Sequence, residues 1–427
     1  MSDNSWSNIC ERVDTCALTG AAAFYAGIPD TEILVNGPLW CYFYAMRYLE
    51  HGIFNIAERM HGSQPDNSAV VFGAEKFIKQ AIKHLLNEKH YPKLLFVENS
   101  CAMSLIGDDI TGIVSSMKLP FPVIAMDCGG LIGGFAEGYV KAAILFLHQF
   151  AEKTDIVKSS INLLGLTDFY YNGKADRIEI CRILKQAGYK INVLFGAGSN
   201  IDALKNIAGA ELNIVCNEEL GLEIAKYLEE NYGTPYVCAG LPYGIEGTKN
   251  WIEKIHNRLE APALEKVLSE CDEAQYEITI LNNDINMLWG DLWFDNVLVS
   301  APGTIAMCIG NALRSEWADT GNMTIICQNK VPDFYCELAD SIYVINEDTT
   351  LIHRYYQEIN NVLVLGSSSD SSILMRNKAD FRYCNIANPG IDEVNFSETP
   401  FVGVRGSRYM LQRLWNIFIA DKLGRNK

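Results

Sequence analysis

The sequence predicts an α/β protein made of three similar units, each with a parallel sheet, arranged around a central cleft. Short apolar, β-rich runs alternate with longer segments whose apolar residues recur at helical spacing, which is the pattern of parallel α/β layers. The 427 residues are enough for about three domains of ~150 residues each. Hydrophobic residues make up 49% of the chain and charged residues 20%, which indicates ordinary globular cores.

The first predicted unit comprises residues 1–155. Residues 93–99 and 121–127 have the composition of buried strands. Residues 74–90 carry apolar side chains at helical spacing, and residues 141–153 predict the helix that closes the unit. We therefore expect a sheet whose strands are connected by helices.

The second unit, residues 156–275, repeats this alternation. The predicted strands are 161–165, 190–198 (a strand with its turn) and 212–217. The predicted helices are 200–210 and 220–233, and the second ends at Gly233. A polar amphipathic stretch from Trp251 to Gln275 precedes the third unit, residues 276–427. The strand-like runs of the third unit are 297–303, 324–328, 341–346 and 361–368, with helices between them.

Charge and cysteine content exclude several classes of protein. Lysine and arginine number 35 and aspartate and glutamate 52, so the formal net charge is −17, which argues against nucleic acid or an anionic membrane as a partner. The longest apolar runs, such as 141–150, are about half of the ~20 residues needed to cross a bilayer, and the polar start of the chain does not resemble a signal peptide. We therefore expect a cytoplasmic protein whose thirteen cysteines are thiols or metal ligands.

Three cysteines lie in runs of glycine, proline and small residues. Cys16 begins CALTGA, Cys41 ends NGPLWC and Cys101 begins CAMSLIGDDI. Thiolates are the preferred ligands of iron-sulfur clusters, and small residues let backbone N–H groups approach the cluster sulfides. No C-x-x-C or H-x-x-x-H pair offers a competing zinc site. The alternative is that these cysteines are small buried hydrophobic residues, as most of the thirteen must be.

These phrases resemble the component 1 family of nitrogenases, in which a first Cys lies in C-x-x-x-G-A, a second ends H-G-P-x-G-C and a third begins C-x-x-x-x-I-G-D-D-I. This chain departs from the pattern at Asn36, where the family usually has His, and at Trp40, where it usually has Gly. Further phrases are similar in order along most of the chain. They are 71–82 (a strand-to-helix segment), 121–139 (a loop before a helix), 161–165 (the strand opening the second domain), 211–236, 363–370 and 400–406.

The resemblance implies three Rossmann-like domains and an iron-sulfur cluster held by Cys16, Cys41 and Cys101. The cluster is either [4Fe–4S] or an eight-iron cluster of the P-cluster type. Three thiolates from one chain cannot complete a four-cysteine cubane, so a second chain must supply the rest. The resemblance therefore implies a homodimer, or a heterodimer or heterotetramer with a paralogous subunit.

The activity implied is that of an oxygen-sensitive oxidoreductase, the catalytic half of a two-component reductase. An ATP-dependent iron protein would deliver electrons one at a time, and the interfacial cluster would relay them to a substrate or cofactor in the cleft. The chain has no G-x-x-x-x-G-K-[ST] loop, so ATP hydrolysis would belong to the partner. The alternatives are a scaffold on which a nitrogenase-type metallocofactor is assembled and a cluster-free α/β binding protein. The substrate stays open.

By resemblance, the loop with Asp108 and Asp109 lies where the iron protein docks. The two carboxylates also fit a strand-to-helix connection, in which they would cap the helix and stabilise its first turn.

The substrate end of the chain departs further from nitrogenase. The thiolate that binds the catalytic metal would align with Asn217, one residue beyond Cys216, so Cys216 is either a cofactor ligand or a core thiol. The cofactor-binding histidine near the C-terminus has no counterpart. A different metallocofactor or a tetrapyrrole is therefore expected in the cleft. Candidates to line it are Arg405, as a cation toward an anionic ligand or in a salt bridge, and His61, Tyr170, Tyr171 and Trp289.

Overall fold

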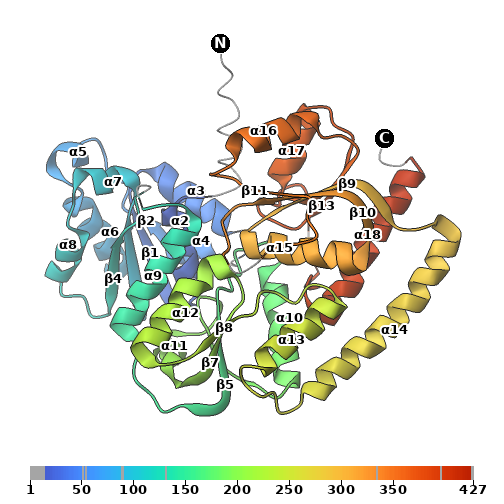
Figure 1. Ribbon diagram of the computed structural model, residues 1–427. Coiled ribbons are helices and arrows are strands. Elements are labelled where there is room, and N and C mark those ends of the chain that lie inside the picture. Colours follow the sequence, from blue (N-terminus) through green and yellow to red (C-terminus); the bar gives the residue numbers. More distant parts are fainter. Residues whose placement is uncertain are drawn as a thin grey trace.

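Strands and helices alternate throughout the protein, and the strands form three separate sheets in which every strand pairing is parallel (Figure 1). The computed structural model describes residues 15–50, 52, 55–87, 91–129, 132–332, 335–394 and 397–424. The polar N-terminal segment 1–14 and the last three residues of the predicted helix 74–90 lie outside this part of the chain.

The first sheet has the strand order β2-β1-β3-β4. Its strands are β1 (Thr31–Asn36), β2 (Met60–Gly62), β3 (Leu94–Asn99) and β4 (Val123–Asp127). The helices around it are α2 (Ala17–Ala26), α3 (Leu39–Leu49), α4 (Ile56–Arg59), α5 (Ala69–Phe72), α6 (Glu75–Asn87), α7 (Cys101–Ile106), α8 (Ile110–Ser116) and α9 (Phe135–Phe150).

Helices cover both faces of this sheet because its strands are apolar on both faces. Every residue of α2 is buried, and α2 packs against α9 on one face. Their contact is close: a Cβ on Gly138 of α9 would lie 2.0 Å from the carbonyl oxygen of Ala17. The buried residues of α6 and α8 cover the other face, with Ile78 and Ile110 among them.

The second sheet has the order β6-β5-β7-β8 and lies at the bottom of Figure 1. Its elements are β5 (Val157–Leu164), α10 (Gly173–Gln186), β6 (Lys190–Leu194), α11 (Ile201–Lys205), a short 3₁₀ turn (Ile207–Gly209), β7 (Ala210–Val215), α12 (Glu218–Tyr232), β8 (Tyr236–Cys238) and α13 (Ile245–His256). Helix α12 ends as the sequence predicts, because Gly233 takes the left-handed conformation (φ 76°) that stops a helix.

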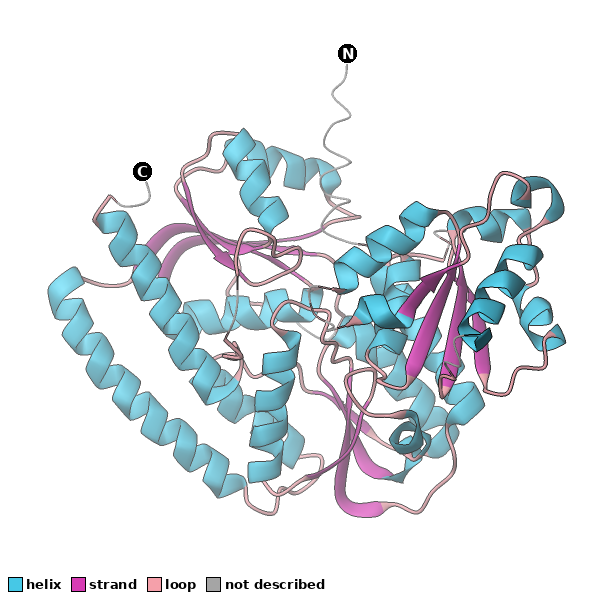
Figure 2. Ribbon diagram, turned by 180° about the vertical axis from the view of Figure 1, so that it is seen from behind, coloured by secondary structure: helices cyan, strands magenta, loops and turns pink. Residues whose placement is uncertain are grey.

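The third sheet has the order β11-β10-β9-β12-β13. Its elements are β9 (Trp293–Ala301), α15 (Gly303–Ala312), a π-helical turn (Leu313–Trp317), β10 (Asp319–Cys327), β11 (Ser341–Val344), α16 (Thr349–Glu358), β12 (Val362–Gly366), α17 (Ser368–Arg376) and β13 (Phe381–Asn385). The long helix α14 (Leu264–Trp289) leads into this unit along one edge of the molecule, and α18 (Gly403–Lys422) returns to pack against α10, α13 and α14 (Figure 2).

The predicted fold class is confirmed, with three parallel α/β sheets in one molecule. Three predicted elements differ. The helix predicted over 200–210 ends at Lys205, and a 3₁₀ turn (Ile207–Gly209) and the start of β7 follow it. Helix α9 begins at Phe135 instead of residue 141, because the Glu137 carboxylate accepts a hydrogen bond from the Gly134 N–H (2.9 Å) and caps a glycine-rich start. Residues 71–82 contain no strand, since the chain forms α5 and then α6.

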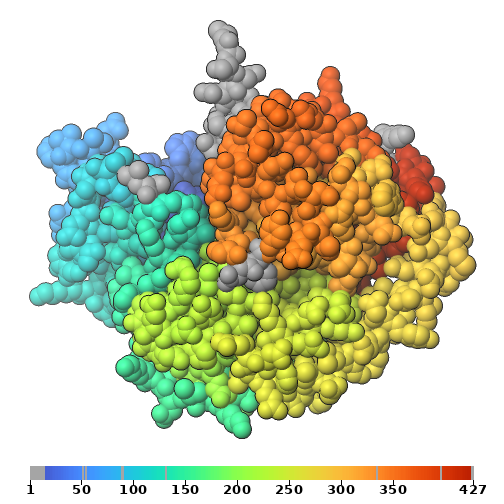
Figure 3. Space-filling view, in the orientation of Figure 1, coloured from blue at the N-terminus to red at the C-terminus, as the bar shows by residue number. Residues whose placement is uncertain are grey.

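The domain boundaries stay a prediction. Each sheet lies within one predicted range, but the boundary at residue 275 falls inside the continuous helix α14. The three units meet closely in the space-filling view, and one hydrophobic core runs through all of them (Figure 3). No helix in the described segments is both long enough and apolar enough to pass through a bilayer.

Candidate metal centre

The three predicted cluster cysteines all lie at the carboxyl edge of the first sheet, each at the start of a helix. Cys16 is the N-cap of α2, Cys41 lies in the first turn of α3, directly after β1, and Cys101 is the first residue of α7, directly after β3. Cys16 and Cys101 are exposed and Cys41 is half-buried. Helix N-termini favour negative charge, so these positions suit thiolates.

Close contacts between the turns bring the thiols together. Cys16 forms an isolated antiparallel bridge with Gly134. A Cβ on Gly37 would lie 2.4 Å from Ser100 Oγ, and one on Gly129 would lie 2.8 Å from Ser104 Oγ in the helix that begins at Cys101. Glycine is therefore needed where the turns touch, as the sequence pattern indicated.

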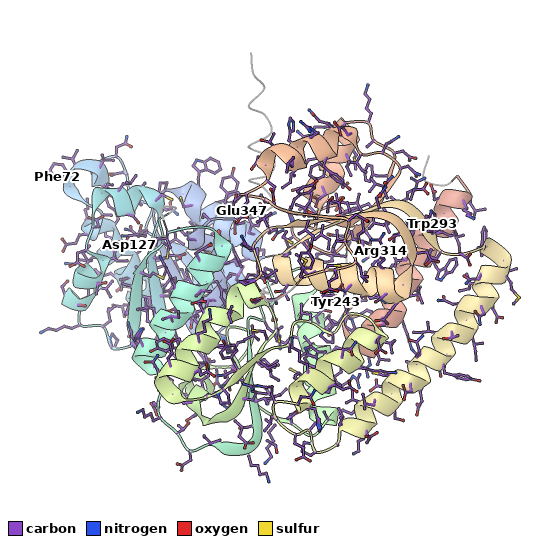
Figure 4. All side chains as sticks on the ribbon, in the orientation of Figure 1. Phe72, Asp127, Tyr243, Trp293, Arg314 and Glu347 are labelled. Atoms are coloured by element: carbon purple, nitrogen blue, oxygen red, sulfur yellow. The ribbon has the colours of Figure 1, made fainter. Side chains whose placement is uncertain are left out.

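A row of hydrogen bonds joins the strand ends beneath the cysteines. The Ser63 hydroxyl donates to Asn36 Oδ1 (2.7 Å), Asn36 Nδ2 donates to Asn99 Oδ1 (2.8 Å) and Asn99 Nδ2 donates to Asp127 Oδ1 (2.7 Å). The Ser104 hydroxyl also donates to Asp127 Oδ1 (3.0 Å). We call this set the edge ladder. It includes Asn36, the residue that stands where the family has His, and Asp127 is labelled in Figure 4.

Burial raises the pKa of Cys41, and the neighbouring Cys16 and Cys101 thiols raise it further. Cys16 and Cys101 therefore lie close enough to Cys41 to influence the charge of its thiol. Iron would stabilise all three thiolates at once. No group of three or more His, Cys, Asp or Glu side chains in the described residues could hold a metal ion. Thiolates are the donors that iron-sulfur clusters use, each thiolate binding its own iron, so the chemistry of the three side chains is that of cluster ligands.

Exposed apolar side chains lie on the two helices that carry Cys41 and Cys101. The helix α3 presents Leu39, Trp40, Phe43 and Tyr44, which are 39–63% exposed, and we call these four residues the aromatic face of α3. Trp40 stacks on Tyr44 with ring centroids 5.7 Å apart, so the indole points outward beside the second cysteine. Leu105, which lies four residues after Cys101 in α7, is 75% exposed. Clustered exposed apolar side chains mark interaction surfaces.

The two acidic residues after the third cysteine both cap helices. Asp108 Oδ2 accepts a hydrogen bond from the Ala74 N–H (2.7 Å) at the start of α6, and Asp109 Oδ1 accepts one from the Gly112 N–H (2.9 Å) in α8. The loop connects α7 to α8, so the expected strand-to-helix connection is wrong in one respect: the short helix α7 intervenes. The docking role stays a prediction.

Cys216 lies in the core directly after β7, with a fully buried thiol whose pKa is raised by burial. The Asn217 amide is also buried and donates to the Gly165 carbonyl oxygen (2.7 Å). This placement is typical of a core thiol beside a structural asparagine. Ligation by Cys216 stays untested.

A small cavity lies where the three units meet. Its volume is about 20 Å³, and its lining comes from all three units: Thr15, Tyr48, Phe135, Phe169, Tyr170, Tyr171, Pro302, Ile305, Gln328, Asn329, Ile386, Ala387 and Asn388. Phe135 and Phe169 stack across it with centroids 4.9 Å apart. A cavity of this size holds about one water molecule, and its lining offers no thiol or imidazole. The residues at this cavity therefore do not fit a metallocofactor or a tetrapyrrole.

Of the other residues that the sequence suggested for the cleft, two line this cavity and three lie elsewhere. Tyr170 and Tyr171 line the cavity as predicted. His61 Nε2 instead contacts Glu32 Oε2 (2.7 Å), and Arg405, 63% exposed, pairs with Glu179 (3.7 Å), which is the salt-bridge alternative. Trp289 lines a groove of about 370 Å³ between α14 and α18.

Sequence reasoning missed two residues beneath the cysteines. Cys128 follows β4 at the same sheet edge and is buried, and Glu98, the penultimate residue of β3, is fully buried. Burial holds the pKa of the Cys128 thiol well above its usual range, and the neighbouring Glu98, Asp127 and Cys16 raise it further. Two features of the sequence could have pointed to them: a carboxylate within an otherwise apolar strand, and a cysteine directly after the next strand.

Comparisons with known proteins extend over nearly the whole chain. The family model described as nitrogenase component 1 type oxidoreductase matches residues 16–419. The nitrogenase iron-molybdenum cofactor biosynthesis protein NifE of Clostridium pasteurianum is 30% identical over 56% of this chain, which spans about half (52%) of that protein. The nitrogenase iron-iron protein beta chain of Rhodobacter capsulatus is 24% identical over 95% of this chain and 93% of its own length. A solved structure of nitrogenase Cp1 at pH 6.5 superposes with a TM-score of 0.78 over 97% of this chain and 94% of that one; at 18% identity, this likeness concerns the fold alone.

Proposed function

Because the chain belongs to the family of nitrogenase component 1 type oxidoreductases, we propose that it is the catalytic component of a two-component reductase. An ATP-dependent iron protein supplies low-potential electrons, and the chain passes them through an iron-sulfur cluster bound by Cys16, Cys41 and Cys101. The observation that carries this proposal is the convergence of three thiols at one exposed sheet edge.

When bound, the cluster supplies a one-electron carrier. The chain's own residues hold it in place: three cysteines at helix starts donate the thiolates, and glycines at 37 and 129 let the turns close. The edge ladder fixes the strand ends below. Burial of Cys41 gives the site a partly dry wall, which strengthens electrostatic interactions there.

A second subunit completes the site, either a copy of this chain or a paralogous one. Cys16 and Cys101 face outward, so a ligand from another chain can reach the same cluster. The aromatic face of α3 supplies apolar area beside them, and aromatic residues are enriched at the cores of interfaces. Asp108 and Asp109 belong to the surface on which the iron protein docks.

Assembly of a nitrogenase-type metallocofactor is the second candidate function. It is favoured by Asn217, which replaces the thiolate, and by the small cavity among the three units, which offers no ligand for a finished cofactor. Turnover with an ATP-dependent iron protein and ATP supports the reductase. Release of a cofactor to an acceptor protein without turnover supports assembly and contradicts the reductase.

The decisive experiment is anaerobic purification of the chain with its partner, followed by iron and sulfide analysis and EPR spectroscopy. Cys101→Ala should lose or convert the cluster. Cys216→Ala, which removes a fully buried thiol, is the matched control and should keep the full iron content. An unchanged iron content and EPR signal in Cys101→Ala would contradict the ligand assignment. Loss of metal in Cys216→Ala would instead make Cys216 a ligand.

A further inference from the structure

Helix α14 carries an apolar heptad repeat, and the chain itself covers mainly the first half of it. Val267, Cys271 and Ala274 are buried, on the part of α14 that packs against α10 and α13. The same alternation of four and three residues continues through the second half of the helix at Ile278, Leu281, Ile285 and Leu288. There, Leu281 is 61% exposed and Leu288 is 80% exposed. Such a repeat is the seam along which one helix packs against others, so the described residues leave the second half of the seam partly uncovered.

The open half of the seam forms one wall of the groove between α14 and α18, which has a volume of about 370 Å³. The opposite wall is α18, with Leu411, Trp415 and Ile419. Helix α14 stands along one edge of the molecule, with α18 beside it (Figure 2). Exposed apolar side chains gathered in one groove mark a site at which another molecule binds.

Two hydrogen bonds hold the walls of the groove in place. The Trp415 indole N–H donates to Asn282 Oδ1 (2.9 Å). Farther along, Lys422 Nζ donates to the carbonyl oxygen of Trp289 (3.1 Å). The walls are therefore ordered before a ligand arrives, which lowers the cost of binding. The α14 lining extends from Glu277 to Trp289, about three helical turns, so the shape of the groove suits a second helix laid along it.

The charges beside the seam favour one kind of helix. Acidic residues flank the seam at a regular spacing of seven residues, at Glu270, Glu277 and Asp284. In a coiled coil, flanking positions of this kind form salt bridges with the neighbouring helix. Glu270 pairs with Arg182 of α10 (2.8 Å) and Glu277 with Arg408 of α18. Asp284 occupies the same position beside the open half of the seam, and no cation among the described residues pairs with it.

We propose that the groove between α14 and α18 binds an amphipathic helix of another protein, apolar at heptad spacing and carrying an arginine or lysine that pairs with Asp284. The apolar side chains of that helix complete the seam. A second copy of α14 does not supply the cation, because its only basic residue, Lys266, lies near the other end of the helix. The groove and the first sheet lie at opposite sides of the molecule (Figure 1), so this interaction is independent of the proposed function.

The test is fluorescence anisotropy of two labelled synthetic peptides with the purified full chain. Both peptides have three heptads with leucine and isoleucine at the seam positions. One carries arginine at the flanking positions and the other carries glutamate, so the two differ only in charge. The arginine peptide should bind, and the glutamate peptide should bind more weakly by about tenfold or more.

Variants of the chain locate the binding site. The double variant Leu281→Ser, Leu288→Ser removes two exposed apolar side chains from the groove and should weaken binding of the arginine peptide by about tenfold or more. Asp284→Lys should reverse the preference, so that the glutamate peptide binds more tightly than the arginine peptide. The matched control is Tyr276→Ser. This residue is 70% exposed on the same helix but does not line the groove, so binding should not change.

The outcomes that contradict the proposal are distinct. Failure of both peptides to bind the native chain overturns it, as does native preference in Asp284→Lys. If the native chain alone self-associates in sedimentation equilibrium and the double variant does not, the groove binds a second copy and the proposal is wrong. Unfolding of a variant cannot imitate the expected result, because the reversal in Asp284→Lys requires a gain of binding by the glutamate peptide.

Discussion

The carboxyl edge of the first sheet and the junction of the three units are built in opposite ways. At the edge, the Cys16 and Cys101 thiols are exposed, glycines let the turns close, and aromatic side chains project outward. At the junction, aromatic rings from different units stack on one another, and the cavity that the described residues line there has a volume of about 20 Å³. The edge therefore exposes thiols and aromatic rings to solvent, whereas the side chains at the junction pack against one another and hold the units together.

The largest expected effect comes from opening the junction. Phe169→Ala removes a ring that is 5% exposed and stacks on Phe135, so the free energy of unfolding should fall by about 3–5 kcal/mol. Urea denaturation measures this change. Tyr276→Ala removes an aromatic ring that is 70% exposed and serves as the control, with a change within about 0.5 kcal/mol. Iron content should stay native in both variants. Loss of the cluster in Phe169→Ala would show that the two regions are not separable.

A smaller effect is expected where α9 supports the edge. In Gly138→Ala the new Cβ would lie 2.0 Å from the Ala17 carbonyl oxygen, next to Cys16, so the helices must separate. We expect a loss of about 1–3 kcal/mol of unfolding free energy together with reduced iron content. The control is Gly247→Ala in α13, where the nearest atom is 3.9 Å away and the substitution should be neutral or slightly stabilising. If Gly138→Ala keeps its native iron content, cluster binding does not depend on the position of α2.

The amount of iron incorporated during cluster reconstitution should depend on pH. The pKa of Cys41 is raised, chiefly by burial, so its thiolate is scarce near pH 7 in the metal-free protein. Metal binding requires the thiolate, and below its pKa the thiolate fraction grows about tenfold per pH unit. Iron incorporated at a fixed limiting iron concentration should therefore rise between pH 7 and pH 9. A decrease over this range, measured anaerobically by iron analysis, would contradict the role of Cys41.

The smallest effect on stability is expected on the aromatic face of α3. Trp40 is 63% exposed, so Trp40→Ser should change the free energy of unfolding by no more than about 0.5 kcal/mol. It should weaken association with the partner subunit, as measured by analytical ultracentrifugation. Trp293, labelled in Figure 4, is 49% exposed in the third unit, and Trp293→Ser should leave association unchanged. Equal association of the two variants would place the partner elsewhere.

The sequence was informative where periodicity and strand ends decide the structure. Apolar spacing predicted α6, and the apolar composition of residues 93–99 and 121–127 predicted β3 and β4, whereas β1 and β2 were not predicted. The start of α9 was missed because a glycine-rich run gives no helical signal, although Glu137 caps it. Glu98 and Cys128 were missed because their burial side by side at the sheet edge depends on which strands are neighbours. Alternation within one strand does not reveal this. The filled junction depends on aromatic side chains from units far apart in the sequence.

The edge ladder has a consequence for the speed of electron transfer. It joins the ends of four adjacent strands through Ser63, Asn36, Asn99 and Asp127, so the turns that carry Cys41 and Cys101 are tied to one another on adjacent strands, about 4.8 Å apart. A frame held in this way has little to rearrange when its charge changes. Under the proposed function, the reorganisation energy of an electron arriving at this edge should therefore be small.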